Sequence, residues 1–211
     1  MNELVGCERA GRTYGRGRNA VVAVHGVDCA VTEGDRIAVT GPSGSGKTTL
    51  MHLLAGLDQP TSGHVRRRAV TVGIVFQGLS LLPPLNIVEN VALPLLIAGC
   101  DEKEAGERAL NALKTVDLAD LAERLPEEVS GGQAQRAAVA RVLAAAPRLI
   151  IADEPTGQLD SAQAAHVMDL LVELATGLRA GLVVATHDTS VADRLTSRWE
   201  MRDGTLRSRS C

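Results

Sequence analysis

The sequence predicts an α/β fold in which helices cover a mainly parallel sheet. Segments 149–152 and 181–186 are short, largely apolar runs with the length of buried strands. Between them, Val167, Leu170 and Leu174 recur at helical spacing. Strands that alternate with helices favour a parallel sheet, because each helix carries the chain back to the end of the sheet at which the previous strand began. The 211 residues, 45% of them apolar and 22% charged, are enough for a single domain with an adequate core.

The N-terminal third is rich in predicted strands. We expect strands over 20–25, 29–32 and 36–40, with a turn at 33–35. The three arginines at 66–68 are interpreted as a solvated loop. The alternative, a nucleic-acid patch, lacks the interleaved aromatic residues that such a patch uses.

The middle of the chain is predicted to be mainly helical. A helix should run over 46–57 and a strand over 72–76. Asn86 and Asp101 each precede a glutamate by three residues, which is the pattern of a helix start. The second of these helices is expected over 101–118.

Near the C-terminus the alternation of helices and strands continues. A helix is expected to begin at Gly131 or Gly132 and to reach Ala146, where Pro147 stops it. The pair at 203–204, Asp-Gly, predicts a terminal hairpin.

Composition and charge exclude several classes of protein. A net charge of −3 gives no general attraction to nucleic acid, so no nucleic-acid partner is expected. The apolar stretches are too short to span a membrane, and the polar start at residues 1–3 is unlike a signal peptide. The four cysteines have neither metal-ligand nor disulfide spacing, which favours a reduced cytoplasmic setting: Cys7, Cys29, Cys100 and Cys211.

A phosphate-binding loop is predicted at residues 41–48, which fit G-x-x-x-x-G-K-[ST] and follow the apolar run 37–39. Its glycines let successive N–H groups point at phosphate oxygens, and the following helix adds its positive dipole end. Lys47 would contact the outer phosphates, and the Thr48 hydroxyl would ligate Mg²⁺. The alternative, a chance Gly/Ser-rich turn, is disfavoured by the preceding strand. The predicted nucleotide-binding residues here are Gly41, Ser43, Gly44, Ser45, Gly46, Lys47, Thr48 and Thr49.

Two carboxylates end the apolar strand at 149–152. Asp153 is placed to hold the Mg²⁺ shell, and Glu154 to polarise an attacking water. Ligands of α/β sheets bind at the carboxyl ends of strands, so this position suits a nucleotide site. The alternative for Glu154 is a cap on the following helix.

A second anion cradle is predicted at residues 129–133. Its Ser and two glycines open a helix and offer a further set of N–H groups. One nucleotide needs only one such cradle. The second one therefore predicts a site that another subunit completes.

With these motifs the chain resembles the ATP-binding subunits of ABC transporters over nearly its whole length. Segment 80–96 looks most like the lipoprotein-release, macrolide-export and cell-division branch. The resemblance implies a P-loop NTPase core, a helical lobe near 78–146 and a single domain over 1–211. The matching motifs are Walker A at 41–48, the Q-loop at Gln77, the signature at 129–133, Walker B at 149–154, the D-loop at 156–160 and the switch histidine at His187.

The resemblance implies a head-to-tail dimer, homomeric or heteromeric, with two ATP molecules held between Walker A of one chain and the signature of the other. It assigns Ser130, Gly131, Gly132 and Gln133 to the partner's ATP, and Asp160 to coupling of the two sites. Gln77 would sense the γ-phosphate or Mg²⁺ and a membrane partner.

Two further residues take their roles from the resemblance. His187 would contact the γ-phosphate, and Tyr14 would stack on adenine. The alternatives are a polar strand end for Gln77, a satisfied strand-end histidine for His187, and local packing for Tyr14. The other histidines are interpreted as structural or surface residues: His25, His52, His64 and His166.

The chain departs from the resembled branch in three places. Between Gly63 and Val72 the usual strand, loop and short helix are expected to be largely absent, which reduces the antiparallel β lobe. Val129 stands for the usual Leu, and Gln158 for the frequent Asn.

The predicted function is a Mg²⁺-dependent ATPase that powers an ABC transporter, of exporter or mechanotransmission type. It would act through a separate integral-membrane permease, as a cytoplasmic subunit on the inner face of the plasma membrane. The alternatives are a soluble ABC-type ATPase acting on ribosomes or DNA, and a regulatory module that closes on ATP without useful hydrolysis.

Overall fold

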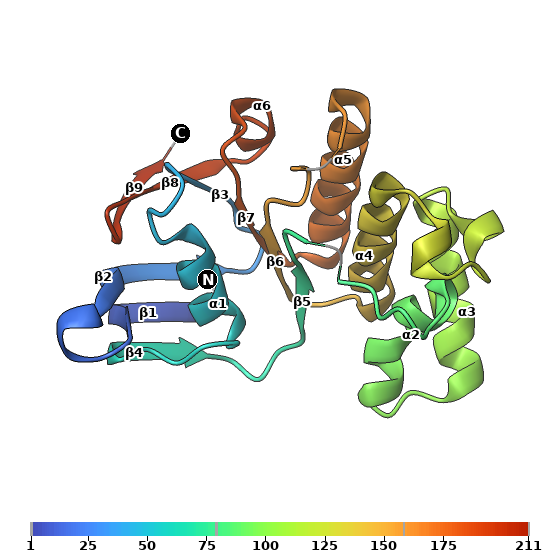
Figure 1. Cartoon of the computed structure of the whole chain (residues 1–211), viewed down its shortest axis with the longest axis horizontal. Helices are drawn as coiled ribbons and strands as arrows, with labels where there is room; N and C mark the ends of the chain where they lie inside the picture. Colours follow the sequence, from blue (N-terminus) through green and yellow to red (C-terminus); the bar gives the residue numbers. More distant parts are fainter. Residues whose placement is uncertain (1, 79, 158, 211) are drawn as a thin grey trace.

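A computed structural model describes residues 2–78, 80–157 and 159–210 of the chain. Strands and helices alternate along most of it (Figure 1). Their bounds are β1 Glu3–Tyr14, β2 Val21–Thr32, β3 Arg36–Thr40, α1 Lys47–Ala55, β4 Ser62–Arg67, β5 Val72–Val75, α2 Ile87–Ile97, α3 Glu102–Thr115, α4 Gly131–Ala145, β6 Leu149–Asp153, α5 Ser161–Leu178, β7 Gly181–Ala185, α6 Thr189–Ala192, β8 Ser197–Arg202 and β9 Thr205–Ser210.

The central sheet has the strand order β5-β6-β7-β3-β8-β9. Every neighbouring pair is parallel except the β8–β9 hairpin, which turns at the predicted Asp203-Gly204. All residues of β6 and β7 are buried, as expected of strands covered on both faces. The predicted α/β fold with a mainly parallel sheet is confirmed.

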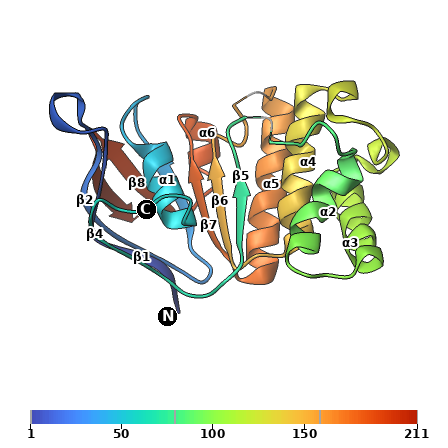
Figure 2. The same cartoon turned by 60° about the horizontal axis from the view of Figure 1, so that its bottom comes forward.

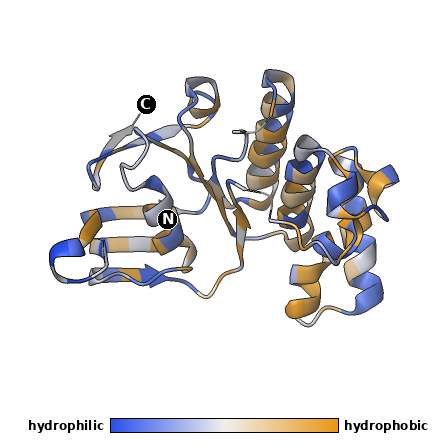
Figure 3. Cartoon of the chain, viewed as in Figure 1, coloured by the Kyte–Doolittle hydropathy of each residue, from blue (hydrophilic) through white to orange (hydrophobic). Residues whose placement is uncertain are grey.

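Helices cover the central sheet on both faces, and each face has its own core. Figure 2 shows α1 between the sheet and strands β1, β2 and β4, with α5 and α4 on the opposite face and α2 and α3 beyond them. Ile150 packs into the core on the α5 side and Ile151 into the core on the α1 side. Successive strand residues point to opposite faces, so one apolar strand serves both cores. Figure 3 shows apolar residues on these central strands and on α5 and α2.

The antiparallel lobe is a three-stranded sheet of order β2-β1-β4. The prediction of two strands over 20–25 and 29–32 is wrong, because β2 runs continuously through both. Gly26, which lies between the two predicted strands, has φ +56° and lies where the register with β1 shifts. A glycine with positive φ accommodates an extra residue in the strand, so the chain bulges without leaving the sheet.

The interpretation of the three arginines as a loop is wrong for two of them. Arg66 and Arg67 belong to β4, which pairs with β1, and the expectation that a strand is absent after Gly63 is likewise wrong. Arg66 also forms an ion pair with Glu8 of β1. Most of β4 is exposed, and it therefore lacks the apolar alternation that marks a half-buried strand.

The predicted helix starts are confirmed by their capping bonds. Asn86 accepts from the Glu89 N–H at 2.9 Å, and Glu89 accepts from the Asn86 N–H at 2.8 Å, a capping box at the start of α2. Asp101 caps α3, which ends at Thr115 rather than near 118. In the described part of the chain, no helix combines the length and hydropathy that crossing a membrane requires.

Candidate nucleotide-binding site

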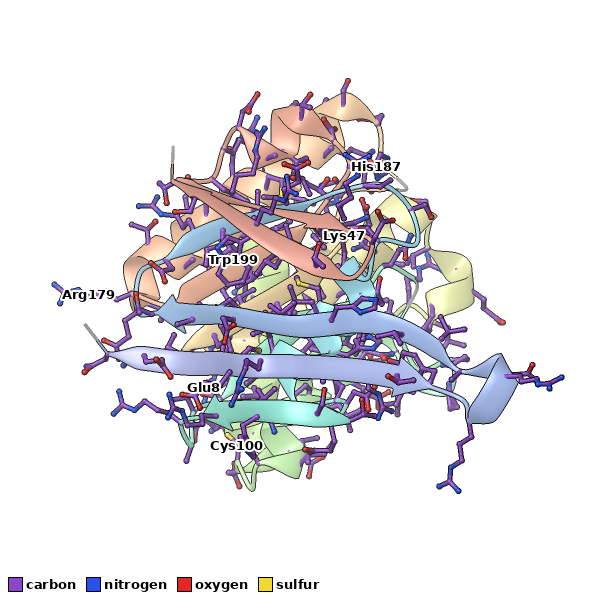
Figure 4. All side chains as sticks on the ribbon, turned by 90° about the vertical axis from the view of Figure 1, so that its left-hand side faces the viewer. Glu8, Lys47, Cys100, Arg179, His187 and Trp199 are labelled. Atoms are coloured by element: carbon purple, nitrogen blue, oxygen red, sulfur yellow. The ribbon has the colours of Figure 1, made fainter. Side chains whose placement is uncertain are left out.

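A cavity of about 620 Å³ lies at the carboxyl ends of the neighbouring strands β3, β5, β6 and β7. Residues far apart in the sequence meet there because parallel strands end at one edge of the sheet. Figure 4 shows the side chains of Lys47 and His187 on the same side of the molecule. The lining residues are Ala23, Gly41, Pro42, Ser43, Gly44, Gly46, Lys47, Thr48, Thr49, Gln77, Asp153, Glu154 and His187.

The phosphate loop joins β3 to α1 and is wedged between the backbones of two other strands. Gly41 has φ +148° and Gly46 has φ +99°, and a Cβ at either position would collide with a backbone oxygen, Met201 O or Ala23 O respectively. Only glycine therefore permits this close approach. Lys47 Nζ donates to the carbonyl oxygens of Gly41 at 2.9 Å and Pro42 at 3.1 Å.

The start of α1 gives this loop its affinity for anions. Because α1 begins at Lys47, its first N–H groups lack carbonyl partners within the helix and lie at the positive end of the dipole. Ser43, Gly44, Thr48 and Thr49 line the cavity with them. Ser45 does not, since its side chain is buried beneath the loop.

Asp153 ends β6 and is only 6% exposed. Burial raises the pKa of Asp153 above its usual value, whereas a hydrogen bond with Thr48 acts in the opposite direction. Its Oδ1 has no hydrogen-bond partner, although buried polar atoms are usually paired. A buried, unpaired carboxylate oxygen next to a hydroxyl is the donor chemistry that a hard cation requires.

The described residues fit a magnesium ion that is shared with a nucleotide. They contain no group of three or more His, Cys, Asp or Glu side chains arranged to hold a metal. Mg²⁺ is commonly held by one or two protein oxygens together with water and substrate phosphates, so no such group is needed. Asp153, Thr48 and Gln77 all face the cavity and can supply those oxygens.

Glu154 is held in an unusual backbone conformation directly after β6. Its φ is +48°, and its N–H donates to Ala185 O at 2.9 Å, which extends the pairing of β6 with β7. A left-handed conformation at a residue with a Cβ is strained, and such strain concentrates at functional sites. The Glu154 side chain is 10% exposed, and Oε1 lies 2.9 Å from Nδ1 of His187. The alternative role as a helix cap is wrong, because Asp160 caps α5.

Tyr14 lies at the end of β1 and is not among the residues that line the cavity. Its Oη donates to Asp58 Oδ2 at 2.8 Å, and the guanidinium of Arg12 lies 4.7 Å from the ring centroid. Arg12 also forms an ion pair with Asp58 at 2.8 Å. Burial acts to raise the pKa of Asp58, but bonds from Tyr14, the Gln59 N–H and Arg12 outweigh it, and the pKa is lowered. These contacts of Tyr14 with Asp58 and Arg12 were not predicted from the sequence.

The second predicted anion cradle lies outside this cavity. Ser130 caps α4 by accepting from the Gln133 N–H at 3.2 Å, while Gln133 Oε1 accepts from the Ser130 N–H at 2.7 Å. A Cβ on Gly132 would lie 2.6 Å from Oε1 of Gln163, so the starts of α4 and α5 adjoin, and Asp160 caps α5 there. Gln158 lies outside the described residues.

Of the four histidines interpreted as structural or surface residues, His52 bears on the site. A positive charge on its ring would act, as that of Lys47 does, to lower the pKa of Asp153 against the effect of burial. His52 belongs to α1, the helix that begins at the phosphate loop. The sequence alone does not reveal that His52 lies near Asp153.

A glycine loop between a strand and a helix, with Lys47, Asp153 and Glu154 at one edge of a parallel sheet, defines a P-loop ATPase. Residues 24–157 match the family described as ABC transporter. The chain belongs to this family and is an ATP-binding, ATP-hydrolysing subunit of a transporter.

Relatives and solved structures agree over nearly the whole chain. The lipoprotein-releasing system ATP-binding protein LolD of Legionella pneumophila (strain Paris) is 41% identical over 226 residues, covering 99% of this chain and 100% of the relative. LolD of Xanthomonas campestris pv. campestris (strain 8004) is 40% identical, covering 97% and 92%. The dimeric post-hydrolysis structure of the ATP-binding cassette MJ0796, bound to ADP and Pi, has a TM-score of 0.92 and 34% identity over 98% of each chain.

Proposed function

We propose that this subunit drives a transporter of the lipoprotein-releasing type from the inner face of the plasma membrane, through a separate permease. The names of the relatives support the substrate class. The observation that carries the proposal is the division of the site: Lys47, Asp153 and Glu154 share one cavity, whereas Ser130 lies outside it. A chain that contributes one half to each of two ATP sites needs a second ATPase subunit to complete them.

Within one chain the residues divide the chemistry of hydrolysis. Lys47 and the first N–H groups of α1 bind the phosphates, and Asp153, Thr48 and Gln77 would hold Mg²⁺. The ion would neutralise charge that develops on the phosphate oxygens. Glu154 accepts the proton of the attacking water, and His187 orients Glu154 and contacts the γ-phosphate. Tyr14, fixed by Arg12 and Asp58, stacks on adenine.

Across the dimer, Ser130, Gly131, Gly132 and Gln133 complete the ATP site of the partner, and Asp160 couples the two sites. A dimeric relative of 34% identity supports this arrangement. The N–H groups at the start of α4 favour a phosphate in the same way as those of α1. Loss of the γ-phosphate removes the contact that closes the interface, so hydrolysis reopens it.

The proposed role of Glu154 as the general base is tested by the Glu154→Gln variant. This variant should retain ATP binding and lose about two or more orders of magnitude in turnover, the scale of a general base. Turnover within a few fold of the unmodified chain would remove Glu154 from this role.

The shared site is tested by Gly131→Ala in the Glu154→Gln background. A Cβ at Gly131 meets nothing within 4 Å, so the free subunit should fold unchanged. Size-exclusion chromatography with ATP should nevertheless show a weaker dimer, because in the proposed arrangement the added methyl group would lie where the partner's ATP phosphate binds. Ser130→Arg should abolish the dimer. ATP-dependent dimerisation of Ser130→Arg at the unmodified level would contradict the shared site.

The membrane partner is tested by purifying tagged Glu154→Gln chain from solubilised membranes with ATP and Mg²⁺. Mass spectrometry should identify a polytopic permease, and Ser130→Arg in the same background should retain less of it. Recovery of only ribosomal or DNA-repair proteins would contradict the transporter proposal and favour the soluble ATPase.

A further inference from the structure

Two of the cysteines face each other across the antiparallel lobe. Cys7 of β1 and Cys29 of β2 lie directly opposite each other in the register of the two strands. Their spacing in the sequence does not indicate this pairing. Directly opposed residues of antiparallel strands have Cα atoms about 4.5–5.5 Å apart, which lies within the range of about 4.4–6.8 Å found in disulfides. Figure 4 shows these strands side by side, with Glu8, the neighbour of Cys7, on β1.

The two thiols differ in exposure and are linked by a hydrogen bond. Cys7 is 3% exposed within the core on the α1 side, whereas Cys29 is half-buried and packs against the same core. A hydrogen bond from the Cys29 thiol lowers the pKa of Cys7, against the opposing effects of burial and of Asp28. The same bond and burial raise the pKa of Cys29. One sulfur of the pair thus has increased thiolate character, and the thiolate is the reactive form.

We propose that Cys7 and Cys29 form a redox-active dithiol that a small disulfide of the glutathione type oxidises to an intramolecular disulfide. One cysteine thiolate attacks the small disulfide, forming a mixed disulfide and releasing one small thiol. The other cysteine attacks the mixed disulfide at the protein sulfur and releases the second small thiol. Two electrons pass from the cysteine pair to the small disulfide, and the two cysteine protons leave with the two released thiols.

The position of the pair predicts what oxidation changes. Neither cysteine lines the nucleotide cavity, and β1 is the central strand of its lobe, paired with both β2 and β4. The disulfide would close the chain between Cys7 and Cys29 into a loop and restrict the unfolded state. The midpoint of thermal unfolding should therefore rise by about 5 °C or more, whereas ATP turnover should change less than twofold.

The test uses the full chain with Cys100→Ser and Cys211→Ser, so that only the proposed pair remains. After treatment with oxidised glutathione, a non-reducing digest should contain the Cys7 and Cys29 peptides joined, and a reducing agent should separate them. Mass spectrometry of the intact chain should show a loss of about 2 Da, the mass of the two protons and two electrons removed.

Two matched variants decide between the proposal and ordinary thiol modification. Cys29→Ser and, separately, Cys7→Ala should each abolish both the linked peptide and the rise in the thermal midpoint. Glutathione adducts without the linked peptide, or no reaction at either cysteine, would overturn the proposal. A rise in the thermal midpoint that persists in Cys29→Ser would also overturn it.

Discussion

The backbone at Glu154 offers a direct test of whether strain is stored at the catalytic carboxylate. The test compares the stability of the Glu154→Ala variant with that of the Glu154→Gly variant. Both remove the carboxylate and its contact with His187, so their difference isolates the backbone at φ +48°. Alanine retains the Cβ that makes the left-handed conformation costly, and glycine lacks it.

The magnitude follows from two opposing contributions. A left-handed residue with a Cβ costs about 1–2 kcal/mol. Glycine in place of alanine costs about 0.4–1 kcal/mol through the greater entropy of the unfolded chain. Glu154→Gly should therefore be more stable than Glu154→Ala by about 0.5–1 kcal/mol. For a chain of this size, this difference raises the thermal midpoint by about 1–4 °C.

The assay is thermal and urea unfolding without nucleotide, with a control at Glu107. Glu107 is exposed within α3, where glycine should be less stable than alanine by about 1 kcal/mol, the opposite sign. If Glu154→Ala equals or exceeds Glu154→Gly in stability, the strain argument fails. Neither Glu154 variant should hydrolyse ATP at a measurable rate, so the stability difference is independent of catalysis.

Three further predictions concern charged groups. Lys47→Ala should lose the stabilisation that ATP gives in thermal unfolding, because the phosphates lose their ammonium partner; an unchanged ATP-induced shift would contradict this. Asp153→Asn should raise the unfolding free energy by about 1 kcal/mol without nucleotide, because it removes a buried negative charge that has one carboxylate oxygen without a hydrogen-bond partner, and equilibrium dialysis should show weakened Mg²⁺-ATP binding; a less stable variant would contradict the first part. The pKa of Asp58 is lowered by folding, so its stabilising contribution is present above the unfolded pKa and is lost as pH falls through the folded pKa. Asp58→Asn should flatten this acid decline in urea unfolding, and an unchanged pH profile would contradict it.

The sequence indicates which residues line the cavity because most of them lie at strand ends or in the loop that follows a strand. Lys47, Asp153 and His187 each follow an apolar run whose end is visible in the sequence, and parallel pairing brings those ends together. The capping residues Asn86 and Asp101 are predictable for a similar reason, since their bonds reach only two or three residues along the chain.

The missed features depend on pairing between distant segments. Strand β4 is an exposed edge strand, so its sequence carries no apolar alternation, and only pairing with β1 makes it a strand. The opposition of Cys7 and Cys29 depends on strand register, which shifts between Cys7 and Ala10 and again between Ala10 and Arg12. The contact of Tyr14 with Asp58 joins the end of β1 to the segment after α1. The spacing of residues along the sequence does not indicate which of these distant segments pair.

The two carbonyl bonds of Lys47 affect the thermodynamics of nucleotide binding. A lysine side chain free in solvent has about 2 kcal/mol of rotamer entropy to lose when a ligand immobilises it. In this fold, Gly41 and Pro42 have already immobilised the ammonium, using two of its three N–H donors and leaving the third for a phosphate oxygen. Much of the ordering of this side chain therefore accompanies folding rather than ATP binding, which favours affinity through preorganisation.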